Sequence, residues 1–459
     1  MEINSSLLSL IGNTLMLKLN CFDVGPCELF VKLESQNPGG SIKDRVGLAI
    51  IEDAEESGEL KPGGTIVEAT AGNTGIGLAL VAALKGYKII LVIPDKMSRE
   101  KILHLEGLGA EIILTRSDVP ESHPEYYHNV ARKVVAETPG SFLANQFSNP
   151  ANPMIHRTTT GPEIYEQMSG DLDAVVAGVG SGGTLTGMAE FFRQKDPKIQ
   201  MVAADPEGSI VADAVIKGEF SYDGGSWLVE GVGEDFIPDN LNVDLLDDAV
   251  VVSDKEAFQT LQILVREEGI LGGSSTGTLV AGAVKWCQKQ TTKKKVVTFI
   301  CDTGNKYLSK AFNKSWLQDN DLLDVSERGD LSDLVNRRAD EGDMIYVQPS
   351  DTLMTAYNRM RASDISQIPV LEQKDLVGVI DEEDLLFSVK NDRTSFKKPV
   401  SDFMVTDLDT LQIGASEDEL IEVLTQGKVA IIYDGDKFVG FVTKVDLINH
   451  YRTKVDQHA

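Results

Sequence analysis

A lysine in a tight, glycine-rich loop is the side chain of this sequence best suited to covalent chemistry. Lys43 lies in the run Gly39-Gly40-Ser41-Ile42-Lys43-Asp44-Arg45, here called the lysine loop, between a predicted strand at 29–33 and a predicted helix at about 46–57. The glycines allow a sharp bend, and the positive end of the helix dipole disfavours a second positive charge. This setting lowers the pKa of an amine, and a neutral amine forms a Schiff base with an aldehyde. A solvated lysine at a helix start is the alternative.

A second loop is suited to binding a carboxylate. Residues 70–74, Thr-Ala-Gly-Asn-Thr and here called the asparagine loop, follow a predicted strand and open a helix. Backbone N–H groups at a helix start bind anions, and the amide of Asn73 can hydrogen-bond a phenolic oxygen. These residue types also build ordinary turns, so this loop alone leaves both interpretations open.

A third loop, Gly178 to Gly187, is suited to binding a phosphate and is here called the glycine loop. Its candidate phosphate ligands are Gly180, Ser181, Gly182, Gly183 and Thr184. They combine successive N–H groups at a helix start with two hydroxyl groups. A dinucleotide site competes, because the glycines fit G-x-G-x-x-G and Asp205 follows the next strand. Asp205 comes about 27 residues after Gly178 and precedes a proline, a poor fit to the usual spacing of about 20.

Two further loops complete the set. Gly272 to Gly277, the serine loop, precedes a helix, and Asp302 to Asn305 ends a late strand. Loops at the carboxyl ends of parallel strands converge on one crevice. A lysine, a phosphate cradle, an asparagine loop and neutral hydroxyl groups together predict a pyridoxal phosphate site.

Composition and charge exclude several function classes. The 459 residues carry 43 basic and 71 acidic side chains, and the net charge of −28 argues against binding nucleic acid or anionic lipid. No apolar run is long enough to span a bilayer, and no secretory leader is recognisable. Four cysteines without C-x-x-C spacing fit a reducing cytosol, and six scattered histidines predict no metal site. We therefore expect a cytoplasmic protein.

From residue 7 to about 316, β-branched runs alternate with helical patterns. Buried parallel strands are predicted at 65–68, 88–93, 111–114, 174–178, 200–204 and 296–301. Helices are predicted between them, among others at 77–84, 184–194 and 279–290. This alternation predicts an α/β fold. We place the catalytic domain at 1–316 and a linker, rich in Asp, Asn and Glu, at 317–333.

Beyond the linker the chain contains one internal duplication. Each copy spans about 55 residues with the pattern strand, helix, two strands and helix. Ile368 to Leu371 in the first copy corresponds to Ala430 to Tyr433 in the second. Units this small rarely bury their apolar faces alone, so the copies, at 334–392 and 393–459, are expected to pair with each other.

These loops resemble those of a known family. Residues from about 5 to 316 are similar to fold type II pyridoxal phosphate enzymes of the cysteine synthase and cystathionine β-synthase group, which have a tryptophan synthase β-like core. The resemblance implies that Lys43 is the Schiff-base lysine, that Asn73 bonds the 3′-oxygen of the cofactor, and that Gly180 to Thr184 bind its phosphate. It also implies that Ser275 faces the pyridine nitrogen. A neutral partner there suits β-elimination and replacement.

The resemblance implies a set of substrate-binding residues as well. In the asparagine loop these are Thr70, Ala71, Gly72 and Thr74, with Ala71 standing where many relatives have serine. Gln146 belongs to another active-site segment of the family, in which Phe147 replaces a tyrosine of some relatives.

A distinguishing pattern occurs at Val229 to Pro238, which is similar to the Gly-x-Gly-x-Asp-Phe pattern of cystathionine β-synthases. It implies that Glu230, Glu234 and Asp235 bind the second substrate or cap the closed site. A solvated acidic loop is the alternative for all three side chains.

The duplicated region resembles a pair of CBS domains, a Bateman module that binds adenosyl ligands in many proteins. Thr443 and Asp446 match its Thr/Ser-x-x-Asp ribose motif, whereas Asp381 replaces the hydroxyl residue in the first copy. S-adenosylmethionine, AMP or ATP is therefore expected at the second copy, and a degenerate module kept for packing is the alternative. The haem-binding leader of animal enzymes has no counterpart, so we expect no haem.

The resemblance implies a lyase that condenses L-serine with L-homocysteine to L-cystathionine, a β-replacement of transsulfuration and cysteine biosynthesis that also allows hydrogen sulfide production. Lys43 would act as cofactor attachment point and as general base. O-acetylserine as first substrate, with homocysteine or sulfide as second, is the nearest alternative. A non-catalytic adenosyl-ligand sensor is another. We expect a homodimer or higher homo-oligomer.

Overall fold

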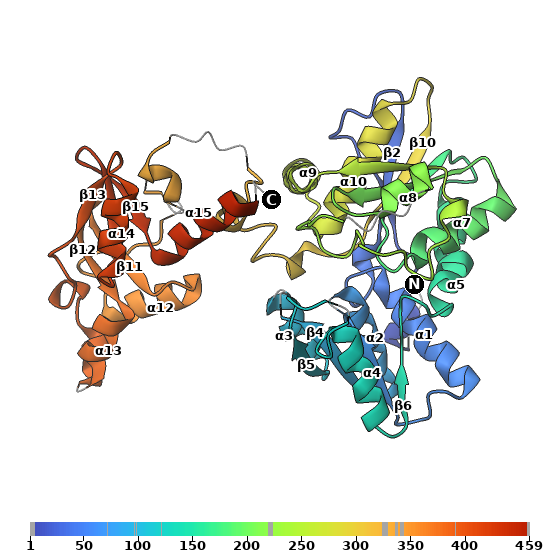
Figure 1. The fold of residues 1–459 in the computed structure, drawn as a ribbon, viewed down its shortest axis with the longest axis horizontal. Helices are drawn as coiled ribbons and strands as arrows, with labels where there is room; N and C mark the ends of the chain where they lie inside the picture. Colours follow the sequence, from blue (N-terminus) through green and yellow to red (C-terminus); the bar gives the residue numbers. More distant parts are fainter. Residues whose placement is uncertain are drawn as a thin grey trace. The chain divides into compact units, whose positions relative to one another are not determined.

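The computed structural model describes residues 5–70, 72–95, 97, 99–120, 122–218, 224–323, 329–335, 338–339, 344–390 and 392–456. The chain forms two units, Met1–Asn313 and Lys314–Ala459, and each is described by itself (Figure 1). The bounds predicted at 316, 333 and 392 remain predictions. Within the described ranges, no helix has the length and apolar character to cross a membrane, and no cluster of side chains has the makeup of a metal site.

Two sheets organise the first unit. In the larger sheet, β1 (Met16–Lys18) pairs antiparallel with β2 (Glu28–Leu33), and all other neighbours are parallel. The order continues with β10 (Lys295–Ile300), β7 (Ala174–Ala177), β8 (Gln200–Pro206) and β9 (Asp248–Val252). The smaller sheet is wholly parallel, in the order β5 (Glu111–Thr115), β4 (Lys88–Pro94), β3 (Thr65–Ala69) and β6 (Ser141–Leu143).

Crossover helices connect these strands, and Figure 1 shows α2, α3 and α4 grouped around the smaller sheet. The helices are α1 (Lys43–Ser57), α2 (Asn73–Lys85), α3 (Arg99–Gly107), α4 (Tyr127–Glu137), α5 (Ala151–Ile155), α6 (Gly161–Gln167), α7 (Gly183–Lys195), α8 (Val211–Lys217), α9 (Asp254–Glu268) and α10 (Ser274–Gln288). The predicted parallel strands are confirmed, whereas β1, β6 and β9 were not predicted.

Three predicted helix starts were wrong in the same direction. The helices begin at Lys43, Asn73 and Ser274, rather than at about 46, 77 and 279. Glycine and small polar residues have low helix propensity, so the pattern assigns them to loops. They are tolerated in the first turn because its N–H groups lack partners inside the helix.

Close contact between α1 and α2 brings the lysine and asparagine loops together. A Cβ atom built on Gly47 would lie 2.5 Å from the backbone carbon of Gly77, and one on Gly77 would lie 2.5 Å from the carbonyl oxygen of Lys43. Only glycine permits this approach. Val46 and Ile76 continue the contact into the core of the smaller sheet.

The second unit contains the predicted duplication. The first copy has α12 (Leu353–Ser363), β11 (Gln367–Glu372), β12 (Asp375–Asp381) and α13 (Glu382–Lys390). The second has β13 (Thr410–Gln412), α14 (Glu417–Thr425), β14 (Ala430–Asp434), β15 (Lys437–Val442) and α15 (Lys444–Asp456), and α11 (Lys314–Asp319) precedes both. The first strand predicted for copy one is reduced to a single bridge between Val347 and Val370.

The two copies pack against each other, as predicted. One buried apolar cluster contains Leu371 and Val379 of the first copy together with Ile431 and Phe438 of the second. Burial of this shared face removes apolar area that each copy alone would expose to water.

Candidate active site

Lys43 is the first residue of α1 and follows the end of β2. Its Nζ donates a hydrogen bond to the Oγ of Ser181 over 3.1 Å, which places the lysine loop against the glycine loop. Burial lowers the pKa of Lys43, while Cys301 and Glu234 oppose the shift. The sequence analysis also predicts a lowered pKa, but it names the helix dipole as the cause, whereas in the structure the main cause is desolvation of the amine.

A buried ionic network holds the lysine loop in place. Arg45 is 1% exposed and donates to both carboxylate oxygens of Glu34, at 2.8 and 2.9 Å, and to both of Glu163, at 2.7 and 2.8 Å. Lys32 pairs with Glu163 at 2.9 Å. Two cations and two anions thus neutralise one another. Burial opposes the shift, but Arg45 holds the pKa of Glu163 down at about 2.

The glycine loop fits a phosphate group. Gly182 has a φ of +80° and precedes α7, and a Cβ atom there would lie 2.8 Å from Leu241. A Cβ on Gly183 would lie 2.1 Å from the Oδ1 of Asn152, so any larger residue at this position would clash with that side chain. Asn152 also donates to Ser181 at 2.9 Å. Thr184 contacts His156 at 3.2 Å.

In the asparagine loop, both ends of the Asn73 amide have partners. Its Nδ2 donates to Asp302 over 2.7 Å, and its Oδ1 accepts from the Nζ of Lys306 over 2.9 Å. Thr74 donates to the side chain of Gln146 over 2.5 Å, and Gln146 reaches Thr70 over 3.4 Å. The structure therefore joins the candidate substrate residues Thr70, Thr74 and Gln146.

The other two predicted substrate residues of this loop are Gly72 and Ala71. Gly72 is the residue that precedes α2, with its N–H donating to the Oγ1 of Thr70 over 3.3 Å. Ala71 lies outside the described residues.

The serine loop lies beside the end of β10. Ser275 is buried and hydrogen-bonds the Cys301 side chain, whose pKa burial and Asp302 raise to about 12. The neighbouring Ser274 accepts a hydrogen bond from the backbone N–H of Glu230 over 2.9 Å. The serine loop thereby anchors the segment at 229–238.

Two acids of that segment differ in environment. Glu230 pairs with Lys101 at 2.5 Å and Lys310 at 2.9 Å. Burial opposes the shift, but these ammonium groups hold the pKa of Glu230 below its ordinary value. Asp235 is exposed. Glu230 is thus engaged inside the unit, whereas the surroundings of Asp235 match the solvated alternative.

Sequence reasoning missed four side chains of this site. Asn152, Lys101, Lys306 and Tyr307 all contact predicted residues or their partners, and the hydroxyl of Tyr307 donates to Asp302 over 2.7 Å. The strand end at Asp302 was noticed, and Lys306 and Tyr307 come just after it. Asn152 lies in the segment from Gln146 to Pro153 that resembles an active-site segment of the family, whereas Lys101 carried no local signal.

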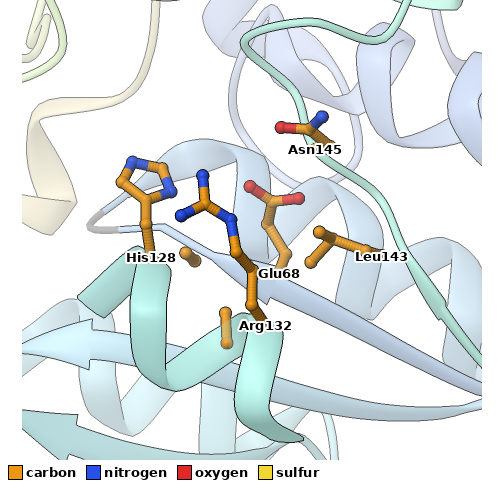
Figure 2. Close-up of a pocket in the computed structure, with 7 residues that line it drawn as sticks. Glu68, His128, Arg132, Leu143 and Asn145 are labelled. Carbon is orange, nitrogen blue, oxygen red and sulfur yellow. The ribbon is translucent and has the colours of Figure 1, made fainter. Parts of the chain in front are cut away.

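A buried acid lies beneath the asparagine loop. Glu68 of β3 is 1% exposed, its Oε2 has no hydrogen-bond partner among the described residues, and it shares a small pocket with His128, Arg132 and Asn145 (Figure 2). Burial raises the pKa of Glu68 to about 8, although the N–H groups of Asn145 and Gln146 oppose the shift.

Replacing Glu68 with Gln should therefore change the pH dependence of stability. The native carboxyl stays protonated up to about pH 8, whereas the unfolded one ionises near 4.5. The carboxyl group therefore contributes its whole share of the free energy of unfolding below pH 4.5. This contribution falls by about 1.4 kcal/mol per pH unit as the pH rises from 4.5 to 8. Chemical denaturation at pH 5 to 9 should show the Glu68→Gln variant gaining stability relative to wild type until about pH 8. A constant difference would contradict the assignment.

Comparison with known proteins identifies both units. The family model for pyridoxal-phosphate dependent enzymes matches residues 7–302, and the model for CBS domains matches residues 331–391 and 400–453. Cystathionine beta-synthase from Dictyostelium discoideum is 34% identical over 462 residues, 98% of this chain and 92% of that protein. Cystathionine beta-synthase from Saccharomyces cerevisiae is 33% identical over 496 residues, 97% of each chain.

Two solved structures share the fold of the first unit. A hydrogen sulfide-producing enzyme from Fusobacterium nucleatum has a TM-score of 0.62 and 36% identity, covering 67% of this chain and 100% of that one. O-ureido-L-serine synthase has a TM-score of 0.63 and 35% identity, covering 72% and 98%. The predicted fold class, a fold type II core with tandem CBS domains, is confirmed.

Proposed function

Since this chain belongs to the cystathionine β-synthase family of pyridoxal-phosphate dependent enzymes, we propose that it condenses L-serine with L-homocysteine to L-cystathionine. The observation that carries the proposal is the hydrogen bond between Lys43 and Ser181, which joins the lysine loop to the glycine loop in a chain matched along almost its whole length. We also propose that the protein carries no haem.

Lys43 is the attachment point and the proton carrier of the proposed reaction. Bound pyridoxal phosphate supplies an electron sink for the negative charge that develops at Cα of the substrate. Lys43 would take the Cα proton of the substrate at Nζ and later return it. Its lowered pKa favours the neutral amine that this role needs.

The other loops position the groups that react. The glycine loop, Gly180 to Thr184, holds the phosphate, and the asparagine loop with Gln146 holds the substrate carboxylate. Ser275 offers the ring nitrogen a neutral hydroxyl group. The Cβ–O bond of serine would break with loss of water, and the sulfur of homocysteine would form the new bond to Cβ, its thiol proton balancing the proton that leaves in the water. Glu230 and Asp235 are proposed to serve this second step.

Replacing Lys43 with Ala should abolish turnover, by at least about 10³-fold, while the fold stays intact. The change removes one amine and creates no large core cavity. Steady-state cystathionine formation and a thermal unfolding curve measure the two effects. Near-wild-type turnover in the variant would refute the role of Lys43.

The identity of both substrates is tested by measuring turnover of serine and of O-acetylserine, each with homocysteine and with sulfide. We expect serine with homocysteine to be turned over faster than O-acetylserine with homocysteine, or than either donor with sulfide. The likeness to a hydrogen sulfide-producing enzyme favours sulfide chemistry as a second activity. Preference for O-acetylserine would replace the proposed first substrate, and no turnover with any pair would favour a ligand sensor.

The second unit is proposed to bind an adenosyl ligand at its second copy. Asp446 accepts hydrogen bonds from the N–H and the hydroxyl group of Thr443, both at 2.6 Å, at the start of α15. The first copy builds the corresponding turn from Asp381 and Asp384. A carboxylate at such a turn can accept both ribose hydroxyl groups. We also propose that the protein is cytoplasmic, in line with its four free cysteines, and that it forms a homo-oligomer.

Calorimetric titration with S-adenosylmethionine, AMP and ATP should therefore detect binding by at least one compound. Replacing Asp446 with Ala should weaken that binding by about 10-fold or more, because the ribose loses a charged acceptor. Asp384→Ala is the matched control in the first copy and should leave the affinity unchanged. No heat with any compound would leave the module a structural role.

A further inference from the structure

Lys306 joins three separate loops of the first unit. It follows β10 and is 4% exposed. Its Nζ donates to the carbonyl oxygens of Gly39 and Gly40 over 2.9 and 3.3 Å, and to the Oδ1 of Asn73 over 2.9 Å. One buried ammonium group therefore contacts both the lysine loop and the asparagine loop.

These contacts select one orientation of the Asn73 amide. An ammonium group can only donate, so the Asn73 oxygen must face Lys306, and the Asn73 nitrogen then faces the acceptor Asp302. The reversed amide would place N–H groups against the cation and a carbonyl against the carboxylate. Tyr307 also donates to the Oδ2 of Asp302, over 2.7 Å, and so fixes the carboxylate.

The selected orientation directs the N–H donors of Asn73 toward acceptors. Asp302 takes one of them, and the hydroxyl group of Tyr307 also hydrogen-bonds the Asn73 side chain, so an acceptor on the cofactor would share or replace the Tyr307 contact. The 3′-oxygen of the cofactor is an acceptor, so only the orientation that Lys306 enforces suits it. Without the cation, the amide loses its only charged donor among the described partners and gains freedom to rotate.

We propose that Lys306 is a positioning residue that orients the Asn73 amide toward the bound cofactor. This inference rests on the proposed function, because it assumes that pyridoxal phosphate occupies the site beside Asn73. Lys306 does not touch the reacting atoms and acts through Asn73. Its bonds to Gly39 and Gly40 keep the lysine loop in register with that amide.

The test is a double-mutant cycle on cofactor affinity. Pyridoxal phosphate is titrated into apoprotein of wild type, Lys306→Met, Asn73→Ala and the double variant, and binding is followed by fluorescence and by the visible absorption band. Methionine keeps the length of lysine without its charge. We expect Lys306→Met to weaken cofactor binding by about 10- to 100-fold and to alter the band.

The cycle separates positioning from a purely structural role. In the Asn73→Ala background, Lys306→Met should change the dissociation constant less than threefold, because the oriented group is absent. Equal losses in both backgrounds, or no loss in either, would overturn the proposal. Lys85→Met, which removes a paired lysine at the other end of α2, is the control and should bind cofactor as wild type does.

Two further results keep the proposals distinguishable. Wild type that binds no pyridoxal phosphate would overturn the proposed function and this inference together, whereas tight binding by both wild type and Lys306→Met would overturn only the inference. If circular dichroism shows that Lys306→Met does not fold, the same double-mutant cycle is measured with Lys306→Gln. Glutamine has no charge and donates fewer hydrogen bonds than an ammonium group.

Discussion

The buried contact between Arg45 and its two carboxylate partners is the constraint on which the site depends. Arg45 lies two residues after Lys43, and Glu34 and Glu163 use all four carboxylate oxygens to hold its guanidinium group. Removing one partner of a buried ion pair typically costs about 3–5 kcal/mol, because the other charge stays buried and unpaired. The network therefore holds the start of α1 in position, and with it the backbone of Lys43.

Helix starts then bring the functional groups to that place. Lys43, Asn73, Gly183 and Ser274 are the first residues of four helices that follow loops near the carboxyl ends of strands. Partner-free N–H groups in these first turns favour anions such as phosphate and carboxylate. Burial lowers the pKa of the Lys43 amine, and the contact between Gly47 and Gly77 sets how closely the first two loops approach.

Local sequence patterns predicted the strands of the first unit other than β1, β6 and β9, as well as the loops and the duplication, since each depends on residues close together in the chain. They started the helices of Lys43, Asn73 and Ser274 three to five residues too late, because propensity undervalues glycine and polar residues there. They could not reveal partners from distant segments. Asn73 and Asp302 are 229 residues apart, and Lys101 and Glu230 are 129 apart. Such pairs arise from packing, and a single sequence contains no pattern that connects them.

The most direct measurement is to locate the cofactor attachment. Holoprotein incubated with pyridoxal phosphate is treated with borohydride, which converts a Schiff base to a stable secondary amine, and then digested and analysed by mass spectrometry. The structure predicts the pyridoxyl group on the peptide that contains Lys43, whose amine contacts the glycine loop. Modification at Lys306 or Lys101 instead, or no modification, would contradict the account.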